Sequence, residues 1–419
     1  MTKVMIWPDL YKEQGHWLPT LNMAYHLDQA GYDVAYMGIK DCEDIVAPYG
    51  YPFHKIFEKI YPLGHTYENS LEPKKQRWKP HHVLPLAQGD LDSIFTGDDK
   101  PDFLVSGYFN ALETLIIHYK YQIPFATVTT YLRHPSQDPA MHALTKLVWM
   151  SNTRAKKIMT LANPNGENDD IRKFVKPLDG AVEGALPEFI VCPREFDFYV
   201  DHYEHLPNVS YVEPMVTRPI PEGAPGPEDP LDNLELPDDK KIIFGTSGSQ
   251  VEDYLFQARK LFDNLIKMMS VRGMEQYHLV LAVGPRLYKE YEKKFQDESP
   301  KNVSLHVWVS QIDVMKRAEV IFTHGGLATI KESIWEKVPI VILPHGKDQM
   351  DNALRIRNTG VGVVGEVSQI TPDRLRALML KAVSSRWIEK KLQKMHDIFY
   401  RYEMWEPKVV SKISEIVPV

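Results

Sequence analysis

Residues 319–353 constrain the fold of this chain more than any other stretch. A short apolar run at residues 320–322 has the length of a buried strand, and apolar residues at helical spacing follow it. Pro339 ends that helix, and residues 340–343 form a second apolar run. A strand, a helix and a strand in this order predict a βαβ unit, whose two strands are parallel and joined by a right-handed connection.

The residues directly after these two predicted strands are rich in glycine and polar side chains. Residues 324–326 (His-Gly-Gly) follow the first strand, and residues 345–349 (His-Gly-Lys-Asp-Gln) follow the second. Because parallel strands end at the same edge of a sheet, we expect both segments on one rim, where open α/β sheets bind ligands. Gly325 and Gly326 let a ligand approach the backbone closely, and the amides that begin the next helix attract phosphate.

Polar side chains at helical spacing extend this predicted phosphate site. Thr329 and Glu332 lie on the same helix face as Gly325, at successive spacings of four and three residues. A carboxylate beside a phosphate suits the paired hydroxyls of a ribose, and Asp348 with Gln349 suits a polyhydroxylated ligand. Phosphate, ribose and sugar together predict a nucleotide-sugar site.

The ordered set resembles the donor-binding signature of family 1 glycosyltransferases of the bacterial natural-product type. Residues 308–311 (Trp-Val-Ser-Gln) stand where the family has Trp-x-Pro-Gln, with Ser in place of Pro, and the other motif residues follow at the family's spacing. The resemblance implies an α/β GT-B fold, in which two doubly wound Rossmann-like domains face each other across a cleft. It implies a donor site formed by Gly248, Ser249, Trp308, Val309, Gln311, His324, Gly325, Gly326, Thr329, Glu332, Asp348 and Gln349.

A second α/β pattern opens the chain and carries a histidine. It predicts a strand at residues 4–7, a helix at residues 18–30 and a second strand at residues 34–37. His16 lies at the start of that helix, where the helix dipole disfavours a cationic imidazole and leaves the ring able to accept a proton. Residues 15–19 (Gly-His-Trp-Leu-Pro) resemble the family's Gly-His-x-x-Pro, which implies that His16 is the catalytic base.

The carboxylate that usually accompanies this histidine is missing from its usual position. In many family members an Asp near the end of the strand predicted at residues 103–105 hydrogen-bonds the base, but residues 105–110 contain no Asp. The nearest carboxylate downstream is Glu113, which we expect on the surface of a helix. The sequence therefore leaves open which group orients His16.

Residues 50–100 are less regular and rich in aromatic residues and histidines. This composition fits either loops with buried aromatic side chains or the wall of an acceptor site, because aromatic rings combine an apolar body with a polar tip. No metal site is predicted at His81 and His82, because no further ligand pattern surrounds them. The predicted acceptor contacts are Trp17, Trp78, Tyr108, Phe109 and Tyr131.

Proline-rich residues 214–239 predict a linker between two domains. We expect an N-terminal acceptor-binding domain at residues 1–220 and a C-terminal donor-binding domain at residues 240–394. The tail is amphipathic and helical. The resemblance implies that its last helix, residues 395–419, crosses back to the first domain; the alternative is a helix that stays on the second domain.

The composition excludes several classes of function. The formal net charge is −7 and no long basic run occurs, which argues against nucleic acid or an anionic membrane as the main partner. The two cysteines, Cys42 and Cys192, form no disulfide framework. No apolar run approaches the length of a membrane span, and the first residues lack a signal-peptide core, so we expect a cytoplasmic protein.

Together these features predict an inverting glycosyltransferase. It would move a hexose from a UDP- or dTDP-sugar to a hydroxyl of a small aromatic or apolar natural product, as in antibiotic biosynthesis, without a metal or other cofactor. We expect a monomer or a homodimer whose partners are this donor and this acceptor. Two alternatives stay open: a nucleotide-sugar epimerase of the same architecture, and a catalytically silent auxiliary protein that binds nucleotide-sugar.

Overall fold

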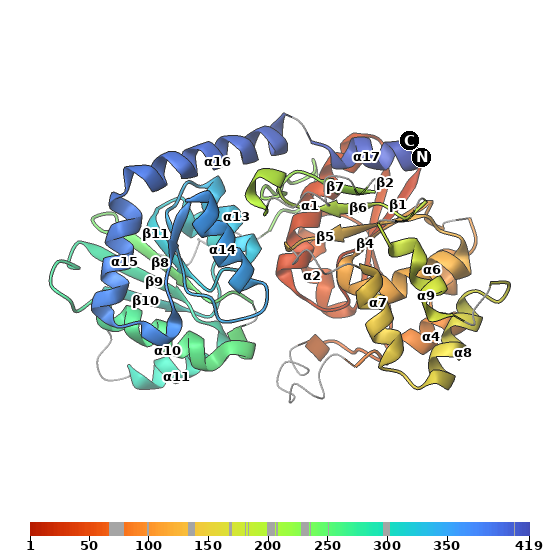
Figure 1. The fold of residues 1–419 in the computed structure, drawn as a ribbon, viewed down its shortest axis with the longest axis horizontal. Helices are drawn as coiled ribbons and strands as arrows, with labels where there is room; N and C mark the ends of the chain where they lie inside the picture. The colour runs from red at the N-terminus through yellow and green to blue at the C-terminus, as the bar shows by residue number, and fades with distance from the viewer. Residues whose placement is uncertain are drawn as a thin grey trace. The chain divides into compact units, whose positions relative to one another are not determined.

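The computed structural model consists of two compact units, each described here by itself (Figure 1). Unit 1 comprises Met1–Cys192, Tyr199–Pro227 and Glu406–Val419, and unit 2 comprises Pro193–Phe198 and Glu228–Trp405. The structure describes residues 1–66, 79–98, 100–132, 139–166, 170–180, 182, 184–198, 206, 208–227, 234, 236–249, 251–295, 302–405 and 407–419.

A seven-stranded parallel sheet forms the centre of unit 1. Its strand order is β3-β2-β1-β4-β5-β6-β7, so the order reverses between β1 and β4, as in doubly wound folds. The apolar runs predicted as strands near the N-terminus are strands in this sheet. The strands are β1 (Lys3–Trp7), β2 (Asp33–Gly38), β3 (Phe53–Lys55), β4 (Phe103–Gly107), β5 (Phe125–Thr129), β6 (Glu188–Ile190) and β7 (Val209–Tyr211).

Helices connect and cover these strands. The C-terminal helix α17 packs against α1, and Thr2 Oγ1 donates to the carbonyl of Pro418 at 2.8 Å. The two chain termini therefore lie side by side in unit 1 (Figure 1). The α-helices of unit 1 are α1 (Gln14–Gln29), α2 (Glu43–Val46), α4 (Val83–Gln88), α5 (Asp92–Phe95), α6 (Ala111–Tyr121), α7 (Pro139–Val148), α8 (Asn152–Ala162), α9 (Ile171–Val175) and α17 (Val409–Ile416).

Helix α1 begins four residues earlier than the sequence predicts, so His16 lies inside its first turn. The amides of His16 and Trp17 both bond to the carbonyl of Glu13, at 2.8 and 3.3 Å. The Trp17 side chain is fully buried, and its Nε1 donates to the carbonyl of Tyr11 at 2.8 Å. Burial of this indole favours the extra helical turn, because removing apolar surface from water offsets the cost of ordering the backbone.

The switch point between β1 and β4 brings two loops into contact. Trp7 is the register partner of Ser106, and Asn110 Nδ2 donates to the carbonyl of Trp7 at 3.2 Å. A Cβ atom on Gly107 would lie 1.7 Å from the carbonyl oxygen of Pro8. The loop after β1 therefore presses against the end of β4, and only glycine fits at that position.

Unit 2 contains a six-stranded parallel sheet with the order β10-β9-β8-β11-β12-β13. Its strands are β8 (Lys241–Thr246), β9 (Tyr277–Ala282), β10 (Val303–His306), β11 (Ala318–Thr323), β12 (Ile340–Ile342) and β13 (Gly362–Val364). The strand, helix and strand expected from residues 319–353 are β11, α13 and β12. The α-helices are α10 (Leu255–Met268), α11 (Gly284–Lys294), α12 (Gln311–Met315), α13 (Leu327–Trp335), α14 (Gln349–Thr359), α15 (Pro372–Ser384) and α16 (Arg386–Met404).

The helical tail divides between the two units. Helix α16 stays with unit 2 and packs against α13, and His396 Nδ1 contacts the carbonyl of Trp335 at 2.8 Å. Residues 395–405, expected in the crossing helix, therefore lie in unit 2, and the part of the tail in unit 1 begins at Glu406. Glu213 receives the amides of Lys408 and Val409 at 2.8 and 3.3 Å, which anchors the start of α17.

A buried arginine ties a short early segment to unit 2. The Arg355 side chain has no exposed surface, and its Nε donates to Asp197 Oδ1 at 2.7 Å. Its Nη1 donates to Asn352 Oδ1 at 3.1 Å, and its guanidinium lies 4.3 Å from the Phe198 ring centroid. A buried charge needs such compensation. This contact explains why Pro193–Phe198 belongs to unit 2.

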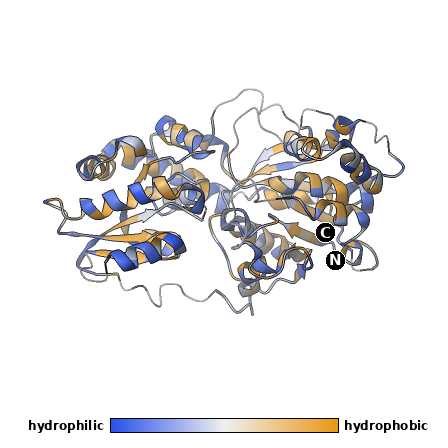
Figure 2. Cartoon of the chain, turned by 90° about the horizontal axis from the view of Figure 1, so that it is seen from below, coloured by the Kyte–Doolittle hydropathy of each residue, from blue (hydrophilic) through white to orange (hydrophobic). Residues whose placement is uncertain are grey.

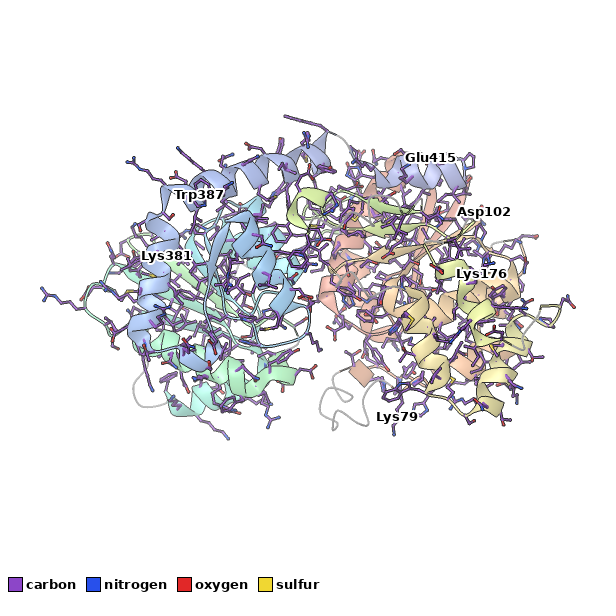
Figure 3. All side chains as sticks on the ribbon, in the orientation of Figure 1. Lys79, Asp102, Lys176, Lys381, Trp387 and Glu415 are labelled. Carbon is purple, nitrogen blue, oxygen red and sulfur yellow. The ribbon has the colours of Figure 1, made fainter. Side chains whose placement is uncertain are left out.

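The distribution of side chains follows this architecture. Apolar residues concentrate on the strands and on the inner helix faces of each unit (Figure 2). Charged residues such as Asp102, Lys176 and Lys381 lie on the outside (Figure 3). In the part of the chain that the structure describes, no helix is long and apolar enough to cross a membrane.

Replacing Gly107 with alanine tests the contact between the β1 loop and β4. The new Cβ would overlap the Pro8 carbonyl, so we expect Gly107→Ala to lower the free energy of unfolding by about 1–3 kcal/mol or more. Gly15→Ala is the control, because nothing lies within 4 Å of its Cβ position. The control should be neutral or stabilising by about 0.4–1 kcal/mol. Equal urea midpoints for the two variants would contradict the proposed packing.

Candidate donor and acceptor sites

The switch point of unit 2 holds the histidine of the His-Gly-Gly segment between two glycines. Strands β8 and β11 pair in parallel with Thr246 opposite Thr323, so the loops after them are neighbours. A Cβ on Gly248 would lie 2.5 Å from His324 Cε1, and one on Gly326 would lie 2.9 Å from His324 Nε2. The His324 ring therefore occupies the space that side chains at both glycines would fill.

Burial keeps the two histidines of this rim neutral. Desolvation, followed by the neighbouring His345, lowers the pKa of His324 to about 3. Desolvation also lowers the pKa of His345 to about 4, and His345 Nε2 lies 3.2 Å from the hydroxyl of Ser247. Neutral imidazoles can donate hydrogen bonds to an anion, and an arriving diphosphate would favour their protonation.

Other predicted donor residues lie on α13, at the start of α12 and in the loops after β8 and β10. Thr329 Oγ1 donates to Gln311 Oε1 at 3.2 Å, which links α13 to the start of α12. Glu332 follows on the same helix and is 6% exposed, whereas Trp308 at the end of β10 is 46% exposed. Val309 is buried beside it and Ser249 is exposed in the loop after β8. A half-exposed indole offers a face on which a nucleobase can stack.

Gln349 has a role that its place in the motif does not reveal. Its Oε1 accepts from the backbone amides of His345 and Gly346, at 2.8 and 3.1 Å. Asn352 Nδ2 donates to the carbonyl of Gly325 at 2.9 Å and to Asp348 Oδ2 at 3.1 Å. These bonds join the loop after β12 to the loop after β11, so the carbonyl end of Gln349 supports the loop that presents Asp348.

In unit 1 the structure supplies the carboxylate that the sequence left open. Asp9 Oδ2 lies 2.5 Å from His16 Nδ1, and Asp9 Oδ1 accepts from the amide of Tyr11 at 3.1 Å. The carboxylate thus comes from the loop after β1, and not from the end of β4. Because an ionised carboxylate only accepts, Nδ1 carries a proton and the lone pair of the neutral ring is on Nε2. The signal in the sequence was an Asp directly after the first strand.

Three of the five predicted acceptor contacts gather beside His16. The Phe109 ring stacks on the His16 imidazole at 5.2 Å between centroids and on Tyr131 at 5.4 Å. Tyr108 packs edge-on against both Phe109 and Tyr131. Phe109 is 37% exposed. These rings form an aromatic wall next to His16.

The other two predicted contacts have different outcomes. Trp17 is a core residue, with its ring between Tyr36 and Phe53, so its assignment to the acceptor site is wrong. Trp78 lies outside the described residues.

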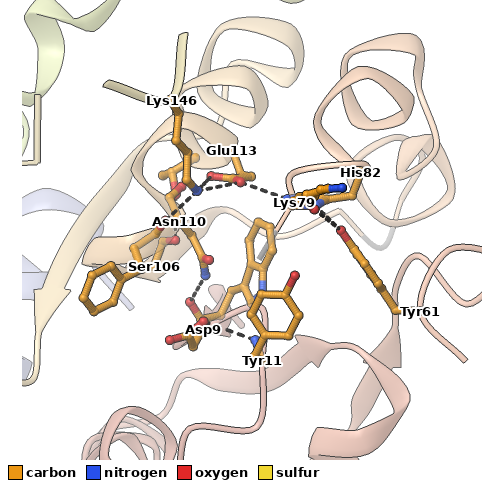
Figure 4. A network of polar contacts seen from close by, with 12 residues as sticks. Asp9, Tyr11, Tyr61, Lys79, His82, Ser106, Asn110, Glu113 and Lys146 are labelled. Atoms are coloured by element: carbon orange, nitrogen blue, oxygen red, sulfur yellow. Dashed lines mark hydrogen bonds and ion pairs between the residues drawn. The ribbon is translucent and has the colours of Figure 1, made fainter. Parts of the chain in front are cut away.

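Glu113 is buried, although the sequence placed it on a helix surface. Both of its carboxylate oxygens receive Lys146 Nζ at 2.8 Å, and His82 Nε2 lies 2.8 Å from Oε1 (Figure 4). Burial alone would raise the pKa of Glu113, but Lys146 and the bond from His82 hold it well below its usual range. Tyr61 Oη lies 2.7 Å from His82 Nδ1 and is the donor to it.

This network supports the aromatic wall from behind. Lys146 Nζ donates to the carbonyl of Phe109 at 2.7 Å, and His142 Nε2 lies 3.1 Å from the same oxygen. Burial, followed by the charge of Lys146, lowers the pKa of His142 to about 4. The ring that faces His16 is therefore positioned by a helix that the buried Glu113 anchors.

Comparison with known proteins agrees with this arrangement. Residues 242–401 match the Glycosyltransferase family 28 C-terminal domain, which covers the donor half of the chain. The oleandomycin glycosyltransferase of Streptomyces antibioticus is 28% identical over 119 residues, or 28% of this chain and 27% of that protein. The aligned segments span less than half the length of the curated relatives.

Solved structures show the likeness over the whole chain. The glycosyltransferase of kitacinnamycin superposes with a TM-score of 0.71 at 18% identity and covers 100% of this chain and 99% of that one. The spinosyn rhamnosyltransferase SpnG complexed with thymidine diphosphate has a TM-score of 0.62 at 15% identity, with 99% and 100% covered. The chain therefore has the two-domain GT-B fold of these structures, and its residues 242–401 match the model of the family 28 C-terminal domain.

Variants of Gln349 test whether its side chain supports the loop after β12 or binds the sugar. Gln349→Ala would leave two backbone amides without their acceptor, so we expect a loss of stability of about 1–3 kcal/mol and weaker binding of both nucleoside diphosphate and nucleotide-sugar. Gln349→Glu keeps an acceptor for these amides and should preserve diphosphate binding while turnover of the nucleotide-sugar falls. Calorimetric titration of both variants with nucleoside diphosphate and with nucleotide-sugar distinguishes the two roles. Full diphosphate affinity in Gln349→Ala would contradict the supporting role.

Proposed function

We propose that this protein is an inverting glycosyltransferase that moves a hexose from a nucleoside-diphosphate sugar to a hydroxyl of a small acceptor. The observation that carries the proposal is the Asp9–His16 pair beside an aromatic wall in unit 1. Unit 2 adds the glycine-flanked His324 and the Gln311–Thr329 contact at its own switch point. One unit thus offers a base, and the other offers groups suited to a diphosphate.

The proposed reaction is a single displacement. His16 Nε2 takes the proton of the acceptor hydroxyl, while Asp9 holds the opposite Nδ1–H and stabilises the imidazolium that forms. The acceptor oxygen attacks the anomeric carbon as the bond from that carbon to the diphosphate oxygen breaks. The bonding electrons leave with the diphosphate, and the attack from the opposite face inverts the anomeric centre.

The leaving diphosphate needs stabilisation as its charge develops. The proposed donors are the amides that begin α13, the hydroxyl of Thr329 and the ring of His324, without a bound metal ion. Glu332 would bind the ribose and Trp308 the nucleobase. The donor is a UDP- or dTDP-hexose, and the thymidine diphosphate in the SpnG complex supports the second of these.

The Asp9–His16 pair also favours glycosyl transfer over an epimerase or a silent auxiliary protein. An epimerase needs acid and base groups beside the sugar, whereas this pair lies next to rings that suit an acceptor. A silent auxiliary protein has no need for a positioned base. Glycosyl transfer to a small molecule therefore accounts for more of the observed contacts than either alternative.

The nucleotide site is tested by removing the buried carboxylate of α13. If Glu332 binds the ribose, Glu332→Ala should weaken nucleoside diphosphate binding by about 1–3 kcal/mol, the value of hydrogen bonds to a charged group. Glu319→Ala is the control, because that carboxylate pairs with Lys241 at the opposite end of β11. Titration with UDP and dTDP measures both variants. Unchanged affinity in Glu332→Ala would remove this residue from the site.

The base is tested by a pair of variants in unit 1. His16→Ala and Asp9→Asn should each lower kcat by roughly 10²–10⁴ while nucleotide affinity stays constant. In the wild type, kcat/KM should rise with pH as the imidazole loses its proton, and this step should vanish in His16→Ala. A pH profile on one phenolic acceptor provides the measurement. Full activity of His16→Ala across the profile would eliminate the residue as the base.

A further inference from the structure

A cavity in unit 1 has no part in the reaction described above. It lies between the segment before α4, the helix α7 and the first turn of α8, and its volume is about 440 Å³. This size falls in the range of small-molecule sites. It is lined by Lys79, Pro80, His81, His142, Thr145, Lys146, Trp149, Met150, Ser151 and Arg154.

The charged side chains that line this cavity are all positive. Its lining contains Lys79, Lys146 and Arg154 but no carboxylate, in a chain whose net charge is −7. Lys146 is neutralised by Glu113 behind the cavity wall. Among the described residues, Lys79 and Arg154 have no ion-pair partner, so two positive charges remain. Such a cavity concentrates positive potential where an anion can enter.

Arg154 contributes a buried donor to the lining of this cavity. Its Nε is buried and has no hydrogen-bond acceptor among the described residues. The planar guanidinium, of which Nε is one donor, matches the planar geometry of a carboxylate. Trp149 adds a large apolar surface at the same cavity, since its side chain is 87% exposed. Exposed indoles beside cationic groups suit an aromatic ring that carries a negative charge.

Phe109 connects the cavity to the catalytic base. Lys146 and His142 line the cavity, and both contact the carbonyl oxygen of Phe109. The ring of the same residue stacks on His16. The cavity and His16 therefore both adjoin Phe109, the cavity at its backbone carbonyl and His16 at its ring.

We propose that this cavity binds the carboxylate of the acceptor, so that the preferred acceptor is an aromatic hydroxy acid. Arg154 and Lys79 supply the charge that recognises the carboxylate, and Trp149 covers the adjoining ring. The hydroxyl at the other end of the molecule then lies at the aromatic wall beside His16. This inference rests on the proposed glycosyl transfer and refines its acceptor from aromatic or apolar to anionic.

Binding measurements without any nucleotide-sugar test the inference. The probes are 4-hydroxybenzoate and 4-hydroxycinnamate, each compared with its methyl ester, titrated calorimetrically into the full-length protein. We expect each acid to bind about tenfold more tightly than its ester, the scale of a charge-assisted hydrogen bond. Raising the salt from about 50 to 300 mM should weaken the acids and leave the esters unchanged.

Variants identify the residues responsible. Arg154→Gln and Lys79→Gln should each remove most of the preference for acid over ester, and Arg154→Lys should restore part of it. Lys156→Gln is the control, because Lys156 is exposed on the same helix and does not line the cavity. An equal loss in Lys156→Gln would show general surface attraction and overturn the proposal.

Two further results would also overturn it. One is equal affinity of acid and ester in the wild type, and the other is no binding of any of the four probes at about 10 mM. These outcomes leave the proposed transfer reaction intact, because nucleotide binding through Glu332 is measured separately. Conversely, binding of the acids without binding of UDP or dTDP would support the proposed cavity site and contradict the proposed transfer reaction.

Discussion

The pairing of β1 with β4, and of β8 with β11, is the constraint on which both candidate sites depend. At a switch point two adjacent parallel strands end side by side, and the chain leaves them toward opposite faces of the sheet, so the loops after them border one crevice. In unit 1 this brings the Asp9 loop against the end of β4, and in unit 2 it brings Gly248 against His324. In each unit, the pairing of two strands thus brings segments that are distant in the sequence into one candidate site.

Buried charge supports the aromatic wall beside His16. Glu113 stays ionised in the core because Lys146 and His82 replace its hydration, and the same Lys146 reaches the carbonyl of Phe109. Removing one member of such a network leaves an uncompensated buried charge. The free energy of unfolding then falls by far more than the complete network contributes to it. The aromatic wall beside His16 is therefore coupled to a polar network that lies behind it, and the cationic cavity shares that network.

Much of the fold was predictable from local patterns. Apolar runs of strand length, glycine after a strand and proline after a helix are local signals, so the strands β1, β2, β11 and β12 were predicted close to their observed bounds. The roles of Trp17, Glu113 and Gln349 were not predictable, because each depends on which neighbours the packed structure supplies.

The sequence by itself determined the α/β pattern that opens the chain, the βαβ unit of residues 319–353 and the residue types at its rim, because these follow from periodicity. The two doubly wound domains were implied by the resemblance to a family. Only the tertiary structure decided which carboxylate faces His16. Asp9 and Glu113 are equally ordinary carboxylates in the sequence, but the loop after β1 carries Asp9 to within 2.5 Å of the imidazole, while α6 carries Glu113 into the core toward Lys146. Hydrogen-bond partners are set by three-dimensional packing, and a one-dimensional pattern does not contain that information.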